Sequence, residues 1–412
     1  MKKRILFVLP NIPWPLDSGG NQAMFNGILS SINIYDVYIS YPVYRKEDLR
    51  ADAKFVESFM NRAVVLPIYV SKKYLSVYQK LNHYIKAIER RIFKYDMNYV
   101  LDCLCSITTP SVQFIDAVNV FIKQYNINIV QVEMNGLMNI VNILPQDVKK
   151  IFVHHEISFV RTQLTFKQVS QDLSYKIKEN ILKDIEVSNL NKYNGIIVLS
   201  EVDKIKLIDA GVKAPVYESF AVVNTKAEDR IHIENSHNLC FVGTENHKPN
   251  FIGLMWFVDN CLPLLLSKDK LYNLKVIGKW SKKTTHELGK QYPCITFTGF
   301  VDNLQEEIQD SIMIVPITIG SGIRMKILEA GKVGIPVVST LIGAEGLPLI
   351  NGENAYLSDS PESFVDSILA LKDAKLRKKL ASNLKAVVVN QYSLESLSKN
   401  RYKIYKSVEE IN

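Results

Sequence analysis

The chain has 412 residues, of which 47% are hydrophobic and 22% are charged, and its formal net charge is +8. This apolar content excludes a globally disordered chain, and the length predicts roughly two domains. The positive balance favours an acidic partner, such as a nucleotide phosphate, an anionic membrane surface or nucleic acid.

The first residues, MKKRILFVLP, place a short apolar run between basic residues and Pro10. This run is too short for the core of a signal peptide and fits a first β-strand. We find no window as apolar as the roughly 18 residues that a membrane span needs. The five cysteines are scattered and have the spacing neither of a disulfide framework nor of a zinc site. We therefore expect a cytoplasmic protein with reduced cysteines and no zinc site.

Short apolar runs alternate with helical patterns along the whole chain, as in parallel sheets covered by helices. In the first half, strands are expected at 4–10, 35–43, 62–70, 127–134, 149–156 and 194–201. Helical patterns separate these runs, the longest from about Lys72 to Tyr125. In the second half, strands are expected at 238–244, 274–280, 294–300, 311–319, 335–340 and 353–359.

This repeated alternation predicts an α/β protein with two Rossmann-like, doubly wound domains. The N-terminal domain is expected over 1–222 and the C-terminal domain over 223–390, with the boundary in the polar stretch 222–236. Residues 391–412 have a helical pattern after the last strand, and we expect this helix to pack back on the N-terminal domain. Ligands of such sheets bind beyond the carboxyl ends of the strands, so we expect the site residues in the turns that follow the strands.

The turn after the first strand reads PNIPWPLDSGGNQ, residues 10–22. Gly19 and Gly20 would let a phosphate or a sugar approach the backbone just before a helix. The dinucleotide-binding pattern G-x-G-x-x-G is absent. An ordinary long surface loop is the alternative, because proline and glycine occur in any loop.

The stretch VHHEIS, residues 153–158, ends another strand of the first half. A histidine there can orient a hydroxyl or accept a proton. Strand alternation lets only one of His154 and His155 face a ligand, and a histidine buried in the core is the alternative. The spacing of a metal-binding helix is missing.

The stretch GSGIRMKILEA, residues 320–330, follows a buried strand in the second half. Gly320, Ser321 and Gly322 are expected to turn the chain into a short helix from Ile323 to Lys332. The backbone N–H groups at such a helix start attract an anion.

Two cations and one acid accompany this turn. Arg324 and Lys326 suit a diphosphate better than a single carboxylate. Glu329 lies further along the helix, where its carboxylate could accept hydrogen bonds from two ribose hydroxyls. The alternative is a capped helix with a Lys/Glu surface pair, which has no need of the glycines.

Several motifs of the second half resemble a known family when taken in order. FVGTENHKPN, LKVIGKW, TFTGFVDNLQ and VPITIGSGIRMKILEAGKVGIPVVSTLIGAEGL look like the donor-binding domain of retaining glycosyltransferases of family 4, the "group 1" sugar transferases. The resemblance covers roughly 238–390 and extends weakly into the first half. It implies the GT-B fold, in which two Rossmann-like domains face a central cleft. It also implies a nucleotide-sugar donor on the second domain and an acceptor on the first.

The resemblance assigns roles to individual residues. In the family's Glu-x7-Glu pattern the second glutamate maps onto Glu329, whereas Ser321 occupies the place of the first. Lys248 stands for the family's lysine after the first strand of the donor domain, and Thr244 lies near the place of its arginine. The donor-binding set implied is Gly19, Gly20, Gly243, Thr244, Lys248, Gly278, Phe300, Val301, Gly320, Ser321, Gly322 and Glu329.

The catalytic residues implied are His155, Arg324 and Lys326. His155 matches the family's histidine and would contact the donor sugar or the acceptor hydroxyl. Arg324 and Lys326 substitute for the missing arginine and stabilise the diphosphate as it leaves. Transfer would retain the anomeric configuration without a metal ion and without a cofactor, with the nucleotide sugar as substrate.

A basic stretch in the first half, residues 70–95, interleaves lysines and arginines with aromatic and aliphatic residues. It predicts a basic amphipathic helix that could lie on an anionic membrane and place the enzyme peripherally on its inner face. A solvated helix packed on its own sheet explains the pattern equally well. We expect no binding of nucleic acid, because no nucleic-acid motif accompanies the charges.

The leading hypothesis is a transferase that moves a sugar from a nucleotide-diphosphate sugar to a saccharide or lipid-linked acceptor in bacterial surface polysaccharide or glycoconjugate synthesis. One alternative is a sugar-nucleotide epimerase of the same fold, which would need acid and base groups around one sugar and no acceptor. Another is a non-catalytic nucleotide-sugar-binding protein, suggested by Ser321. Acceptor-dependent release of a nucleoside diphosphate would distinguish the three.

Overall fold

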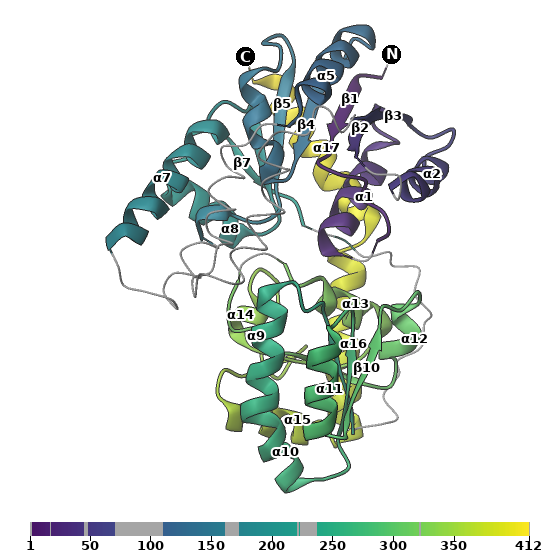
Figure 1. Ribbon diagram of the computed structural model, residues 1–412, viewed down its shortest axis with the longest axis vertical. Coiled ribbons are helices and arrows are strands. Elements are labelled where there is room, and N and C mark those ends of the chain that lie inside the picture. The colour runs from purple at the N-terminus through teal and green to yellow at the C-terminus, as the bar shows by residue number, and fades with distance from the viewer. Residues whose placement is uncertain are drawn as a thin grey trace. The chain divides into compact units, whose positions relative to one another are not determined.

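The computed structural model describes residues 2–16, 18–44, 48–70, 110–160, 173–220, 222, 237–320 and 323–411. They form two compact units (Figure 1). The first unit comprises Met1–Phe220 together with Leu397–Asn412, and the second comprises Ala221–Ser396. The first unit is therefore built from two separate parts of the sequence.

The first unit is a parallel sheet covered by helices. Its strands are β1 (Arg4–Val8), β2 (Asp36–Val43), β3 (Val64–Tyr69), β4 (Ile129–Glu133), β5 (Lys149–His154), β6 (Gly195–Val198) and β7 (Val216–Glu218). Its helices are α1 (Gly19–Ser31), α2 (Asp48–Ser58), α5 (Val112–Gln124), the 3-10 helix η2 (Asn135–Asn142), α7 (Leu173–Leu190), α8 (Glu201–Asp209) and most of α17 (Leu394–Glu410). The strand order is β3-β2-β1-β4-β5-β6-β7.

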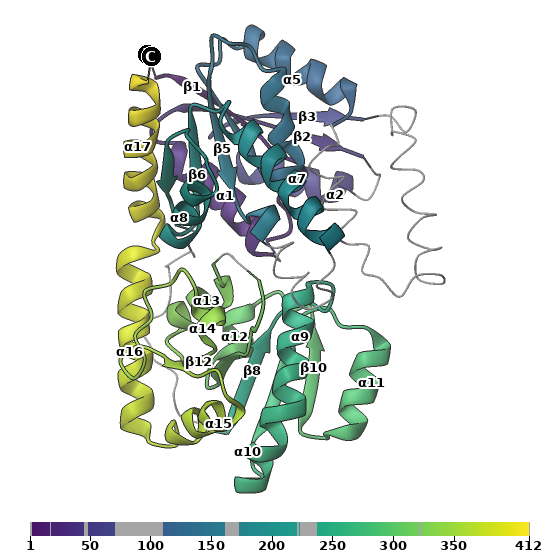
Figure 2. The ribbon, with the colours of Figure 1, turned by 90° about the vertical axis from the view of Figure 1, so that its left-hand side faces the viewer.

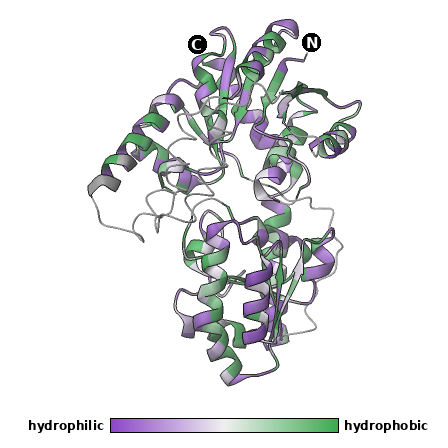
Figure 3. Ribbon diagram, in the orientation of Figure 1, coloured by the Kyte–Doolittle hydropathy of each residue, from purple (hydrophilic) through white to green (hydrophobic). Residues whose placement is uncertain are grey.

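The central strands of this sheet are apolar on both sides because helices cover both faces. Leu6 and Val130 fill the core on one face, whereas Phe7 and Ile129 fill the core on the other. Figure 3 shows the contrast between the largely hydrophobic strands and helices that carry both kinds of residue. A continuous apolar run is therefore the expected sequence of such a strand.

The second unit repeats this plan. Its strands are β8 (Asn238–Val242), β9 (Asn273–Ile277), β10 (Ile295–Gly299), β11 (Ile312–Val315), β12 (Val337–Ser339) and β13 (Tyr356–Leu357), in the order β10-β9-β8-β11-β12-β13. Its helices are α9 (Lys248–Trp256), the π-helical turn η3 (Phe257–Cys261), α10 (Leu262–Lys268), α11 (Lys282–Gln291), α12 (Leu304–Ile308), α13 (Met325–Val333), α14 (Leu341–Ala344), α15 (Pro361–Ala370) and α16 (Ala374–Gln391).

Each sheet changes winding direction at one central pair of strands, β1 with β4 and β8 with β11. Ligands of doubly wound sheets bind beyond the carboxyl ends of the strands at this point. In the first unit a Cβ added to Gly20, after β1, would lie 2.7 Å from Cε of Met134, after β4. In the second unit a Cβ added to Gly253, in α9, would lie 2.6 Å from the carbonyl oxygen of Pro316, after β11. The chain segments around both points are therefore closely packed.

Every strand range expected from the sequence overlaps an observed strand. β7 was not expected, because its three residues, VYE, carry no extended apolar run. Residues 71–95 of the basic stretch, and residues 223–236 of the expected domain boundary, lie outside the described residues. Cys103 and Cys105, two of the five cysteines, also lie outside the described residues. Cys240 and Cys261 are free and buried.

The continuous helical segment Lys248–Lys268 is long and apolar enough to cross a membrane by length and composition, with a mean hydropathy of 1.3. The expectation that no window reaches this level is therefore wrong. Of this window, 44% is buried within the structure, and Leu254, Phe257 and Val258 are fully covered. The segment has the one-sided burial of a helix packed on a protein core.

The last helix, α17, packs on the sheet of the first unit (Figure 2). Ile404, Tyr405 and Val408 belong to the core that also contains residues of β1, β2 and β4. A Cβ added to Gly195 in β6 would lie 2.6 Å from Cγ2 of Val408, so the helix and the strand are in close contact. The side-chain amide of Asn400, near the start of this contact, donates to the carbonyl at the end of β7. The helix therefore runs antiparallel to the strands.

Candidate functional site

The turn after β8 in the second unit is held by backbone contacts that only glycine permits. Gly278, after β9, has a φ of +130°, and a Cβ there would lie 2.3 Å from the carbonyl oxygen of Gly243. The indole N–H of Trp280 donates to the same carbonyl at 2.8 Å. The two glycines expected in the donor site are therefore packed against each other, and Trp280, which the sequence analysis did not single out, fixes their orientation.

Asn250 connects this turn to the helix that carries the expected cations. Its Oδ1 accepts a hydrogen bond of 2.9 Å from Nζ of Lys326, and its Nδ2 donates to the carbonyl of Thr244 at 3.3 Å. A Cβ added to Gly243 would come within 2.6 Å of the Asn250 amide. Asn250 occurs in the motif FVGTENHKPN but received no role from the sequence. A polar residue near the start of the otherwise apolar α9 was the available signal.

Lys326 lies in an apolar environment. Its Nζ is 4.5 Å from the centre of the Phe241 ring, and its hydrogen-bond acceptor is the neutral amide of Asn250. Burial, reinforced by the charge of Arg324, lowers the pKa of Lys326 to about 7. A bound anion that accepts a hydrogen bond from this ammonium group would stabilise its charged form and raise its pKa again.

Arg324 is the second cation of this cluster. It stands immediately before α13 and is 9% exposed. Its Nη2 would lie 3.2 Å from a Cβ added to Gly320, which has a φ of +108°. The two cations and the glycine turn are thus brought together at the carboxyl edge of the sheet. The helix begins two residues later than expected, at Met325, and ends at Val333 before the left-handed Gly334.

Glu329 pairs with Lys332 and not with Lys326, the lysine that stands three residues before it. Its Oε2 lies 3.8 Å from Nζ of Lys332, one turn further along α13, whereas Lys326 binds Asn250. The side chains of both members of this pair are about nine-tenths buried. Burial raises the pKa of Glu329, and the charge of Lys332 opposes that effect. A carboxylate in this position can accept hydrogen bonds from a polar ligand, which would lower the cost of its burial.

The remaining donor residues lie at the edge of the second sheet or outside the described part. Lys248 is the first residue of α9. Phe300, after β10, is 47% exposed, with Nζ of Lys279 at 5.5 Å from its ring centre, and Val301 is half-buried. Ser321 and Gly322 lie outside the described residues.

The two adjacent histidines of the first unit point to opposite faces of its sheet, as strand alternation predicts. Nε2 of His154 lies 2.6 Å from Oε1 of Glu186 in α7, and this imidazole is fully buried. Nε2 of His155 lies 2.6 Å from Oε2 of Glu133 at the end of β4, and its side chain is 9% exposed. The sequence could not reveal either carboxylate partner, because each comes from a distant part of the chain.

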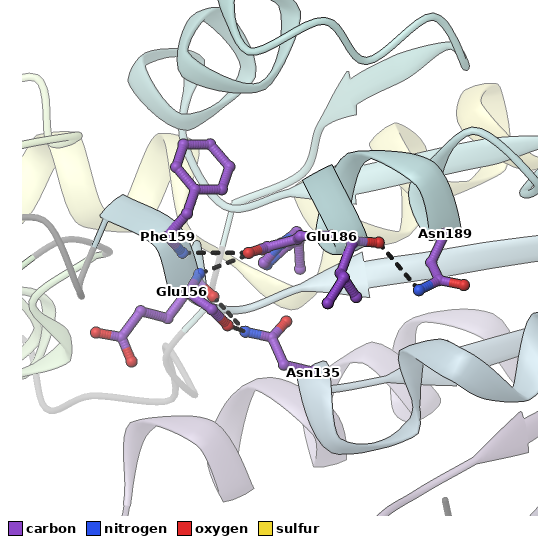
Figure 4. Close-up of polar contacts among 8 residues, drawn as sticks. Asn135, Glu156, Phe159, Glu186 and Asn189 are labelled. Carbon is purple, nitrogen blue, oxygen red and sulfur yellow. Dashed lines mark hydrogen bonds and ion pairs between the residues drawn. The ribbon is translucent and has the colours of Figure 1, made fainter. Parts of the chain in front are cut away.

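Glu186 makes His154 a structural residue. Its two carboxylate oxygens also accept from the backbone N–H groups of Ser158 and Phe159, which begin a helical turn after β5. Figure 4 shows Glu186 directed at Phe159, and Asn135 directed at Glu156, whose carbonyl accepts from the Asn135 amide at 2.8 Å. Of the two imidazoles only that of His155 keeps some exposure to solvent, 9% against 0% for His154.

Gly19 and Gly20 form the first turn of α1. The hydroxyl of Ser18 caps this helix by accepting from the backbone N–H of Asn21 at 3.2 Å. Met134, against which Gly20 packs, has a φ of +68°, an unfavourable value for a residue with a side chain. Backbone strain of this kind persists where the surrounding structure requires it.

No metal site is evident in the part of the chain that the structure describes: no group of three or more His, Cys, Asp or Glu side chains could hold an ion there.

The fold is similar to that of several solved structures over almost the whole chain. The chain is similar to TarM of S. aureus, with a TM-score of 0.71 at 11% identity over 100% of this chain and 99% of that chain. It is similar to sucrose-phosphate synthase from Thermosynechococcus elongatus, with a TM-score of 0.69 at 12% identity over 99% of each chain. It is also similar to HepE of Anabaena in complex with UDP, with a TM-score of 0.68 at 12% identity over 99% of this chain and 100% of that chain. The protein has the GT-B glycosyltransferase fold.

Residues 236–373 match the family model "Glycosyl transferases group 1". An "Uncharacterized 44.6 kDa protein in cps region" of Klebsiella pneumoniae is 26% identical over 235 residues, which are 53% of this chain and 58% of that protein. The match thus spans little more than half of that relative's length. The family match and the fold together support a group 1 glycosyltransferase.

Proposed function

We propose that this protein is a retaining glycosyltransferase that moves a sugar from a nucleotide-diphosphate sugar to a hydroxyl of a saccharide or lipid-linked acceptor. The observation that carries the proposal is the pair of cations at the turn before α13: Arg324 is buried, and Lys326 is half-buried, with a pKa lowered by burial and by the charge of Arg324. Burial and the second cation disfavour the charged form of this lysine in the free protein. A bound diphosphate would reverse that effect through charge-assisted hydrogen bonds. This pair lies within the segment that matches the group 1 family.

The same cations would assist the chemistry. The bond between the anomeric carbon and the diphosphate oxygen breaks, its electron pair stays on the diphosphate, and negative charge develops beside Arg324 and Lys326. The acceptor oxygen forms the new bond on the same face of the sugar, and its proton passes to the departing diphosphate. Two protein cations supply the charge that a divalent metal would otherwise provide, so we propose that the reaction needs neither metal nor cofactor. Glu329 would bind the ribose hydroxyls.

The setting we propose is the synthesis of a surface polysaccharide or glycoconjugate. The relative from a cps region supports this setting, and structures of the HepE and TarM proteins contain UDP, which supports a nucleotide ligand. We further propose a cytoplasmic enzyme, peripheral on the inner face of the membrane. An epimerase or a non-catalytic binding protein is not favoured, because the matched family is one of glycosyl transferases.

Acceptor-dependent turnover tests this proposal. Purified protein would be incubated with UDP-, GDP-, ADP- and TDP-sugars, with and without saccharide and lipid-linked acceptors, and release of nucleoside diphosphate would be measured. We expect release only with an acceptor, retention of the anomeric configuration in the NMR spectrum of the product, and full activity in EDTA. Binding without release in every combination would exclude the transferase, and an inverted product would exclude retention.

Replacement of His155 by glutamine is expected to lower kcat about tenfold while leaving the KM for the donor nearly unchanged, because a positioned imidazole contributes mainly in the transition state. The comparison is made by steady-state kinetics. The matched control is His286→Gln on the exposed face of α11, which should turn over like the wild type. An unaltered rate for His155→Gln would return His155 to a structural role.

Binding of a nucleoside diphosphate is expected to weaken as the pH rises above 7. In the free protein Lys326 loses its proton near pH 7, and a bound diphosphate restores the usual, higher pKa of a lysine. Binding therefore takes up a proton, and Kd should increase about fivefold between pH 7 and pH 8. Titration calorimetry in two buffers with different ionisation enthalpies would measure this uptake. The variant Lys326→Arg, which stays charged, should show no uptake, and a wild-type Kd independent of pH would contradict the assignment.

A further inference from the structure

A chain of hydrogen bonds inside the first unit connects His155 to the last helix. The hydroxyl of Tyr405, in α17, donates to Oε1 of Gln131 at 2.7 Å. Nε2 of Gln131 donates to Oε1 of Glu133 at 2.6 Å, and the other oxygen of Glu133 lies 2.6 Å from Nε2 of His155. Oγ of Ser31, in α1, lies 3.2 Å from the Tyr405 hydroxyl at the far end. Five side chains from α1, β4, α17 and the turn after β5 thus form one series.

The chemistry of these groups fixes the direction of the three bonds between Tyr405 and His155. An ionised carboxylate can only accept, so Gln131 must turn its amide N–H toward Glu133. Its carbonyl oxygen then faces Tyr405 and requires a donor, which is the phenolic hydroxyl. By the same rule Nε2 of His155 carries the proton that it donates to Glu133. Nδ1 of a neutral His155 is then the basic nitrogen.

Because these groups are buried, breaking any one of these hydrogen bonds costs free energy. Gln131 and Tyr405 are fully buried and Glu133 is 2% exposed. A buried polar atom that loses its partner keeps the whole penalty of its desolvation, so one missing donor affects the rest of the series. Nδ1 of His155 is itself buried and has no hydrogen-bond partner among the described residues. This is the atom that the series leaves available for a ligand.

A positive charge stabilises the far end of the series. Arg401, one turn before Tyr405 on α17, is 3% exposed. Burial raises the pKa of the Tyr405 hydroxyl, Arg401 opposes that effect, and Glu133 adds to it. Tyr405 therefore stays a phenol and acts as a donor to Gln131. Arg401 balances part of the charge that Glu133 places in the interior.

We propose that Tyr405 is a positioning residue for His155: through Gln131 it holds Glu133 in the orientation that keeps His155 protonated on Nε2 and basic on Nδ1. The last helix, distant in sequence from β4 and β5, is thereby part of the apparatus that prepares the imidazole. The effect on turnover rests on the proposed function, in which His155 contacts the donor sugar or the acceptor hydroxyl. The effect on the imidazole itself does not.

The structure offers a matched pair of variants. Tyr405→Phe removes the hydroxyl that donates to Gln131. Tyr35→Phe removes a hydroxyl from the same interface, where Tyr35 donates to Glu409 of α17 at 2.7 Å and its ring meets that of Tyr405 edge-on with centres 5.4 Å apart. Both variants lose a phenolic hydroxyl that joins the last helix to the rest of the first unit, but only Tyr405 belongs to the series that ends at His155.

The imidazole 15N shifts of His155 would report its tautomer in full-length protein, with the signals assigned by their loss in His155→Gln. We expect the Nε2–H tautomer in the wild type and in Tyr35→Phe, and a mixture of the two tautomers in Tyr405→Phe. An unchanged tautomer in folded Tyr405→Phe would overturn the proposal. If Tyr405→Phe does not fold, Gln131→Met breaks the same series from the sheet side, and the same two outcomes decide.

Kinetics give the second readout. For Tyr405→Phe we expect kcat to fall about tenfold with the KM for the donor nearly unchanged, as the loss of one buried hydrogen bond implies, and for Tyr35→Phe neither should change. Equal losses in both variants would show a general effect of the last helix and contradict the positioning role. If no donor and acceptor pair gives turnover, the proposed function fails, while the 15N measurement still decides the role of Tyr405.

Discussion

Replacement of Lys326 by methionine is expected to weaken the binding of a nucleoside diphosphate about a hundredfold, the loss typical of a charge-assisted hydrogen bond in a buried site. Methionine keeps the length and the apolar character of the side chain beside the Phe241 ring. It removes the charge and the donor to Asn250. Because a neutral side chain relieves the free protein of a buried cation, stability should be equal or higher while affinity falls.

Calorimetric titration of the variant and the wild type, together with thermal unfolding of each, measures both effects. Lys275→Met is the matched control: it makes the same change on β9, where Nζ of Lys275 bonds to the side chain of Glu307 at 3.0 Å. The control should bind nucleotide like the wild type. A Lys326→Met protein that does so too would show that the cations at α13 do not bind the diphosphate.

Gly278→Ala is expected to destabilise the second unit by about 3 kcal/mol or more, because it combines an unfavourable backbone conformation with a steric clash. The φ of +130° is accessible to glycine and rarely to alanine. The new methyl group would also lie 2.3 Å from the carbonyl oxygen of Gly243, a backbone atom that cannot move aside without displacing the turn after β8. The indole of Trp280, which donates to that oxygen, would be displaced as well.

Urea unfolding monitored by tryptophan fluorescence would measure this loss. Gly289→Ala makes the same change in the last turn of α11, where an added Cβ meets no atom within 4 Å. This control is expected to stabilise the protein by about 0.5–1 kcal/mol, since alanine is the better helix former. Equal stability of the two variants would show that the contact between the turns after β8 and β9 is not required.

The sequence predicted the strands well, and it places the candidate site residues in the turns that follow them, because both inferences depend on local patterns. A buried parallel strand is a short apolar run, and the turn that follows it lies at the carboxyl edge of the sheet whatever the details of packing. Arg324, Lys326 and the glycines around them could therefore be located without coordinates. The observed start of α13, two residues later than expected, is the usual uncertainty of a helix end.

The partners of the site residues could not be predicted, since they depend on which distant segments become neighbours. The contact of Lys326 with Asn250 joins residues 76 positions apart, and that of His155 with Glu133 joins residues 22 apart across two strands. Which carboxylate meets which imidazole is set by the register of β4 on β5. The alternation along one strand shows which of its residues share a face, but not which residue of another strand lies opposite.

The path of α17 has a consequence for the order in which the protein is completed during synthesis. The side chains of Ile404, Tyr405 and Val408 belong to the core of the first unit, although the whole second unit, Ala221–Ser396, lies between them and β7 in the sequence. A nascent chain that has released β1 to β7 from the ribosome still lacks one wall of that core. The second unit, which is continuous in sequence, has all its strands available earlier than the first has its last helix. The first unit is thus translated first but completes its core last. Until α17 is synthesised, the apolar surface that it will cover stays exposed, where it can aggregate or bind chaperones.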